Sequence, residues 1–144
     1  MAAEAVGPSG RVVGIDLVPV DPPLGVGNAI ALVGDLAEAE AVERLLAELG
    51  GPADVLLSDA APKLSGVRAS DRAREEALLE AIEAALPRLL LRGGILVAKL
   101  LDSPEAEGVA ARLARRFGST RTLRLRATRR GSAERYLLGR SFKG

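Results

Sequence analysis

The feature of this 144-residue sequence that most constrains its fold is the alternation of short apolar runs with amphipathic segments. Continuous apolar runs such as RVVGIDL (11–17) and ADVLLSD (53–59) are typical of strands buried on both faces. The segments between them repeat apolar residues at helical spacing. A chain of this kind is predicted to be an α/β protein, with a mostly parallel sheet and helices on both faces.

The pattern predicts nine elements in the order β–β–α–β–α–β–α–β–β. The expected strands are 11–17, 28–36, 53–59, 93–101, 120–127 and 134–142, and the expected helices are 37–50, 70–90 and 103–118. Gly50 should end the first helix, Ser70 should cap the second, and Ser103 with Pro104 should begin the third. The last two strands follow each other without a helix, so we expect an antiparallel hairpin at one edge of the sheet.

The composition excludes several kinds of chemistry. The sequence contains no cysteine and no histidine, which removes disulfides, thiolate metal sites and every nucleophile pair that uses histidine. With 48% hydrophobic residues and no apolar run of 18, the chain is expected to be one globular domain without a membrane span. The N-terminus lacks the pattern of a signal peptide, so a cytoplasmic protein is expected.

Basic residues gather in the C-terminal third. Between residues 112 and 143, eleven arginines or lysines stand against one acid, Glu134. An excess of this kind favours a polyanionic partner, and we expect Arg129, Arg130 and Arg135 to contact it. The alternative is a solvated basic face.

Four polar residues fall at or near the carboxyl ends of predicted strands. They are Asp16, Asp35, Asp59 and Lys99. Open α/β sheets bind ligands at this rim, so together these residues indicate a site. Each aspartate alone could equally be a cap or turn former.

Five stretches of the sequence resemble the FtsJ-type ribose 2′-O-methyltransferases, with the closest likeness among bacterial enzymes of large-subunit ribosomal RNA. They are GRVVGIDLVPVDP (10–22), GDL (34–36), DVLLSDAAPKLSG (54–66), LLRGGILVAKLL (90–101) and SAERYLLGRSF (132–142). The resemblance implies a Rossmann-like methyltransferase fold and S-adenosylmethionine as methyl donor. It further implies a role in rRNA processing by RNA methylation, with 23S ribosomal RNA or the large ribosomal subunit as partner and no metal.

The resemblance also implies the site residues. Asp59, Lys99 and Glu134 match the family's catalytic positions, while Asp16, Asp35, Leu36 and Asp59 match positions that bind the donor. The chemistry is consistent, because a ribose hydroxyl is a poor nucleophile and a neutral amine can accept its proton. A lysine titrates near pH 10.4 and carboxylates beside it raise that value, so the two acids are interpreted as orienting groups.

The N-terminus departs from the family pattern. Family members begin with a basic helix, a further catalytic lysine, a first strand and a glycine-rich GxxPGG loop, and the sequence from Met1 resembles only the family sequence beyond that loop. The missing strand belongs between 11–16 and 54–58, so both should carry unpaired edges unless the sheet closes or another chain fills the gap. The sequence therefore predicts a truncated domain over 1–144, with two alternatives: a non-catalytic RNA-binding relative, or an unrelated nucleotide-binding domain.

Overall fold

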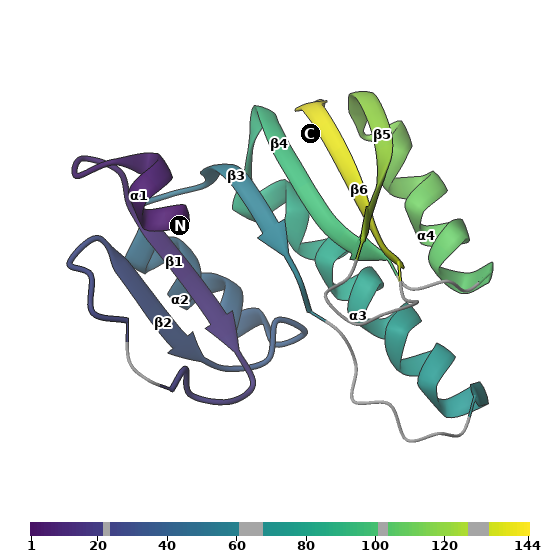
Figure 1. Ribbon diagram of the computed structural model, residues 1–144, viewed down its shortest axis with the longest axis horizontal. Helices are drawn as coiled ribbons and strands as arrows, with labels where there is room; N and C mark the ends of the chain where they lie inside the picture. The colour runs from purple at the N-terminus through teal and green to yellow at the C-terminus, as the bar shows by residue number, and fades with distance from the viewer. Residues whose placement is uncertain (22–23, 61–67, 101–103, 127–132) are drawn as a thin grey trace. The chain divides into compact units, whose positions relative to one another are not determined.

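The computed structural model of the chain has the expected α/β architecture (Figure 1). It describes residues 1–21, 24–60, 68–100, 104–126 and 133–144. The helices are α1 (Ala2–Val6), α2 (Ala39–Leu49), α3 (Arg68–Leu89) and α4 (Pro104–Arg115). The strands are β1 (Val12–Asp16), β2 (Ala29–Val33), β3 (Ala53–Ser58), β4 (Leu90–Leu100), β5 (Phe117–Arg126) and β6 (Ala133–Phe142). The predicted order of elements is confirmed, with α1 as an addition.

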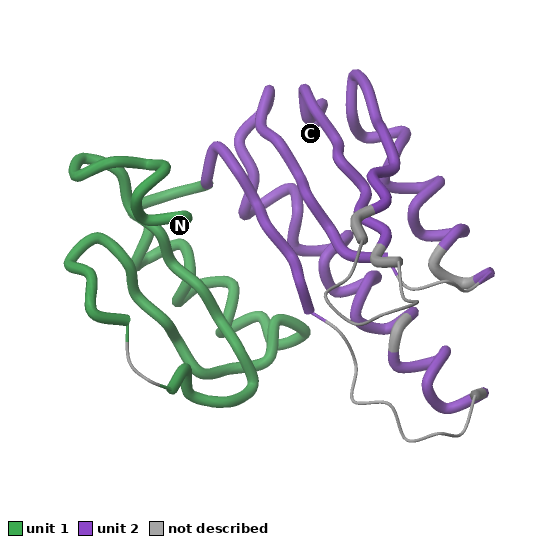
Figure 2. Tube along the Cα trace, viewed as in Figure 1, with its two compact units in different colours: residues 1–52 green, residues 53–144 purple. Residues whose placement is uncertain are grey.

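The chain divides into two compact units, residues 1–52 and 53–144 (Figure 2). In the first unit β1 and β2 pair in parallel, from Val12 opposite Ala29 to Asp16 opposite Val33. Among the described residues of this unit, those that are buried come from α2, namely Ala41, Val42 and Leu45. Gly50 ends α2, as predicted. It adopts a left-handed conformation with φ of 80°, and its N–H bonds to the carbonyl of Leu46.

The second unit holds a four-stranded sheet in the order β3-β4-β6-β5. β3 and β4 are parallel, whereas β6 is antiparallel to both β4 and β5. The predicted antiparallel hairpin is therefore confirmed, with β5 at the edge of the sheet. Because β4 and β6 are neighbours, the carboxyl end of β4 meets the amino end of β6.

The two faces of this sheet differ. Leu96, Ala98 and Leu100 of β4 and Leu137 of β6 are buried, and they form the core with side chains of α3 and α4 such as Leu86 and Leu113. The alternate residues point to the opposite face, where Val55 is 48% and Leu57 is 63% exposed. We call this second side the open face. It carries Leu57, Val97, Lys99, Tyr136 and Leu138, which the strand register places side by side.

Some expectations from sequence were wrong in detail. Ser70 does not cap its helix, because α3 already begins at Arg68 and residue 70 lies within its first turn. β4 begins at Leu90, directly after α3, rather than at 93. The pairing is also less parallel than expected, with two parallel and two antiparallel strand pairs among the described residues, distributed over two sheets.

The expected cap Ser103 lies outside the described residues, while Pro104 is the first residue of α4, as predicted. In the described part of the chain β1 pairs only with β2 and β3 only with β4, so each has one unpaired edge. The single-domain organisation stays a prediction. None of the helices in the described segments is long and apolar enough to cross a membrane.

Candidate active site

The carboxyl end of β3 brings three polar side chains together on the open face. Ser58 pairs with Ala98, so the next residue, Asp59, arrives beside Lys99. The Oδ1 atom of Asp59 lies 3.3 Å from Nζ of Lys99, and it accepts a hydrogen bond of 2.9 Å from the hydroxyl of Tyr136. Tyr136 lies directly opposite Lys99 in the sheet. We call Asp59, Lys99 and Tyr136 the Asp59 cluster.

Burial within the cluster is uneven. The side chain of Lys99 is only 16% exposed, whereas that of Asp59 is 76% exposed. The aliphatic stem of Lys99 therefore packs against the sheet while its amine reaches the rim beside a carboxylate in solvent. Such an arrangement holds the amine at the rim of the sheet, beside the exposed Asp59 carboxylate.

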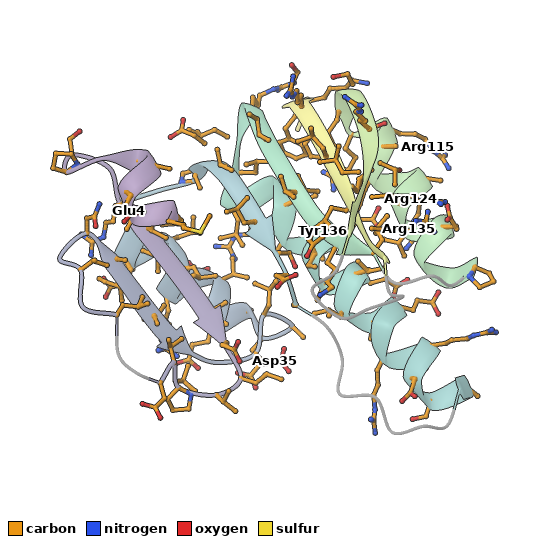
Figure 3. The ribbon with its side chains drawn as sticks, viewed as in Figure 1. Glu4, Asp35, Arg115, Arg124, Arg135 and Tyr136 are labelled. Atoms are coloured by element: carbon orange, nitrogen blue, oxygen red, sulfur yellow. The ribbon has the colours of Figure 1, made fainter. Side chains whose placement is uncertain are left out.

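The other predicted catalytic residue, Glu134, lies in β6 two residues before Tyr136 and opposite Leu125. Its side chain lies outside the described part of the structure, so its contact with Lys99 stays a prediction. Arg129 and Arg130, predicted to bind RNA, also fall outside the described residues. Arg135 is described and is labelled in Figure 3. Its guanidinium pairs with the carboxylate of Glu107 on α4, and only 15% of the Arg135 side chain is exposed.

The predicted donor residues lie in the first unit, at the carboxyl edge of its two strands. Asp16 ends β1 and its Oδ1 accepts the N–H of Val18 at 3.1 Å. Asp35 follows β2 and its Oδ1 accepts the N–H of Ala37 at 2.9 Å. Each aspartate thus shapes its own turn, as a cap or turn former does.

The same two aspartates remain able to bind a ligand. Both are exposed, and the Oδ2 atom of each has no hydrogen-bond partner among the described residues. The backbone brings them close, because Asp16 pairs with Val33 and the N–H of Gly34 bonds to the carbonyl of Asp16. Two carboxylate oxygens at one rim suit the hydroxyl and amino groups of a nucleoside, so these residues fit the adenosine half of the donor. Leu36 follows them, partly buried.

Sequence reasoning gave Tyr136 no role in the site. The signal was present, since Tyr136 follows Glu134 by two positions in a predicted strand, and residues two apart share a face. What the sequence could not provide was the register between β4 and β6, which sets Tyr136 directly opposite Lys99.

Known proteins resemble this chain over nearly its full length. The FtsJ-like methyltransferase family matches residues 1–142. Two relatives, both named ribosomal RNA large subunit methyltransferase E, come from Methanothermobacter thermautotrophicus and Methanoculleus marisnigri. The first is 38% identical to this chain, over 100% of this chain and 68% of its own length. The second is 39% identical, over 94% of this chain and 65% of its own length. The chain thus spans about two thirds of the length of these relatives.

A solved structure has the same fold. A Plasmodium falciparum protein that carries the name ribosomal RNA methyltransferase superposes with a TM-score of 0.75 at 23% identity, over 93% of this chain and 73% of its own. Because the family matches residues 1–142 and the first of these relatives is 38% identical over the whole chain, the chain belongs to the FtsJ-like methyltransferase family.

Proposed function

We propose that this chain takes part in the transfer of a methyl group from S-adenosylmethionine to a ribose 2′-hydroxyl of RNA. The observation that carries the proposal is the position of Lys99, whose amine lies 3.3 Å from the Asp59 carboxylate at the carboxyl rim of the sheet. Membership of the FtsJ-like methyltransferase family supports the reaction class. The named relatives support large-subunit ribosomal RNA as the substrate. The cytoplasm is the proposed location.

Each residue of the cluster has a distinct part in this proposal. Lys99 holds the ribose hydroxyl and accepts its proton as the hydroxyl oxygen attacks. Asp59 orients the amine, and Tyr136 holds Asp59 through its hydroxyl. Glu134 is proposed to approach the same amine from β6. The main contribution is placement of the hydroxyl in line with the methyl group that the donor supplies.

The donor is proposed to bind through the first unit. Asp16 would accept hydrogen bonds from the ribose hydroxyls of the adenosine, Asp35 would accept one from the adenine amino group, and Leu36 would pack beside the base. The uncommitted carboxylate oxygens of the two aspartates support this assignment.

Two substitutions separate the roles of the two sites. The measurements are donor binding by calorimetry, with S-adenosylhomocysteine as ligand, and methyl transfer to ribosomal RNA. Asp35→Ala should abolish donor binding and therefore transfer. Lys99→Met keeps the apolar stem but removes the amine, so it should leave donor binding unchanged and lower transfer by at least about a hundredfold.

Lys143→Met is the matched control, because Lys143 is exposed and its amine bonds, among the described residues, only a backbone carbonyl, that of Arg115. It should change neither quantity. Full transfer activity in Lys99→Met would remove the catalytic role of Lys99. A chain that binds RNA but neither binds the donor nor transfers methyl groups would instead be a non-catalytic RNA-binding relative.

A further inference from the structure

A pocket on the second unit lies outside the Asp59 cluster. It has a volume of about 240 Å³ and is lined by Ser119, Thr120, Arg121, Leu138 and Arg140. It sits where the edge strand β5 pairs with β6, with Ser119 opposite Arg140 and Arg121 opposite Leu138. We call it the arginine pocket.

The polar side chains of the arginine pocket are suited to an anion. Arg121 and Arg140 are both exposed, and among the described residues no carboxylate pairs with either guanidinium. By contrast, Arg112 pairs with Glu80 and Glu83. Two forked guanidinium groups beside a serine hydroxyl offer several hydrogen-bond donors to phosphate oxygens.

The register of β6 connects this pocket to the Asp59 cluster. Tyr136, Leu138 and Arg140 are alternate residues of one strand, so their side chains share the open face. At about 3.4 Å per residue, Arg140 lies roughly 14 Å along the strand from Tyr136, with Leu138 halfway. An extended chain lying on this face could therefore contact the pocket and the rim at once.

We propose that the arginine pocket binds the phosphate backbone of a single-stranded RNA segment while a ribose further along the same strand reaches Lys99. This inference rests on the proposed function for its direction, because only an RNA substrate needs to span both places. Charge complementarity favours RNA, since the pocket presents two cations on the same face as the proposed acceptor site. The intervening Val97 and Leu138 are apolar and only partly buried, so bases can pack on them.

The test compares two double variants that each remove two exposed arginines. Arg121→Ala/Arg140→Ala removes both guanidinium groups from the arginine pocket. Arg115→Ala/Arg124→Ala is the control, because Arg124 lies on β5 opposite Arg135, on the other face, and Arg115 ends α4. Both control residues are labelled in Figure 3. Retention of the thermal midpoint shows that each variant is folded.

Binding of a fluorescein-labelled uridine oligomer of about 16 nucleotides is followed by anisotropy between about 50 and 200 mM KCl. Loss of two phosphate contacts should reduce the slope of log K against log salt by about 1.4 and weaken binding by about tenfold. The control variant should keep the slope of the unsubstituted chain. Equal slopes in all three proteins, or an equal loss in both variants, would overturn the proposal.

A competition experiment identifies the ligand, and a comparison with methyl transfer separates RNA binding at the arginine pocket from catalysis. Unlabelled RNA should displace the probe, whereas polyglutamate of equal charge should not; equal displacement would assign the pocket to acidic polypeptides instead. The binding assay contains no methyl donor. The dependence of RNA binding on the two arginines can therefore hold even if methyl transfer is never observed. Methyl transfer that depends on Lys99 but not on Arg121 and Arg140 would reject only this inference.

If the alanine variant does not fold, Arg121→Lys/Arg140→Lys is measured instead. It should keep the salt slope and weaken RNA binding, because the charge remains and the forked guanidinium is lost.

Discussion

At the scale of single residues, Tyr136 joins the C-terminal hairpin to the rim of β3 through one hydrogen bond to Asp59. Asp59 is 76% exposed, and ion pairs in solvent contribute about 1 kcal/mol or less to stability. The Asp59 cluster is therefore a poor candidate for a stabilising device. Its effect on Lys99 is to hold the amine beside the Asp59 carboxylate.

Tyr136→Phe is expected to impair methyl transfer without unfolding the chain. The substitution removes only the hydroxyl that holds Asp59, so methyl transfer should fall by about ten- to a hundredfold while RNA affinity stays unchanged. The free energy of unfolding should change by no more than about 1 kcal/mol. Transfer rates, RNA binding and denaturant unfolding are measured on the same preparations, with Thr122→Ala as a control on β5. A Tyr136→Phe chain that loses stability but transfers normally would show that the tyrosine is structural.

At the scale of elements, the hairpin of β5 and β6 depends on a glycine beneath an aromatic ring. A Cβ atom added at Gly139 would lie 2.7 Å from Cγ of Phe117, which is too close for the ring to remain in place. Phe117 packs on Phe142 with ring centroids 5.3 Å apart, and both rings are buried. Displacing Phe117 therefore disturbs the end of the hairpin that carries Arg140.

Gly139→Ala is accordingly expected to lower the free energy of unfolding by about 1–3 kcal/mol through overpacking. Gly108→Ala provides a matched comparison, because Gly108 lies within α4 and an added Cβ there meets nothing within 4 Å. Since alanine is the better helix former, this second substitution should raise stability by up to about 1 kcal/mol. The free energy of unfolding of both variants is measured by urea denaturation. A Gly139→Ala chain as stable as the unsubstituted chain would mean that the Phe117 ring can move without loss of stability.

The helix end at Gly50 and the hairpin could be predicted from the sequence, whereas the strand register could not. Local patterns predicted the helix that ends at Gly50 and the antiparallel hairpin, because turn chemistry and the lack of an intervening helix act over short distances. The start of α3 was missed, since Arg68 and Ala69 continue a helix as readily as Ser70 caps one. Strand register is a tertiary property, and for that reason Tyr136 and the arginine pocket could not be read from the pattern of residues alone.

At the scale of the whole molecule, the apolar core is divided unequally. Of the seventeen buried hydrophobic residues in the described segments, only Ala41, Val42 and Leu45 belong to residues 1–52. In its described residues the first unit has two strands, and a sheet of that size needs support from elsewhere to be stable in water. The second unit combines four strands with two helices that pack on each other and are joined by ion pairs from Arg112.

A fragment of residues 51–144 is therefore expected to fold without the first unit, whereas a fragment of residues 1–52 should not. The longer fragment should unfold cooperatively on heating and give a circular dichroism spectrum with both helix and strand. Because the Asp59 cluster and the arginine pocket both belong to it, its RNA binding should keep the salt dependence of the full chain. Donor binding should be lost, since Asp16 and Asp35 are absent.

These outcomes are separated by calorimetry with S-adenosylhomocysteine and by anisotropy with RNA, each measured on the fragment and on the full chain. If the fragment is unfolded, residues 1–144 behave as one cooperative domain, as the sequence predicted; if it is folded and still binds the donor, the donor site does not lie in the first unit.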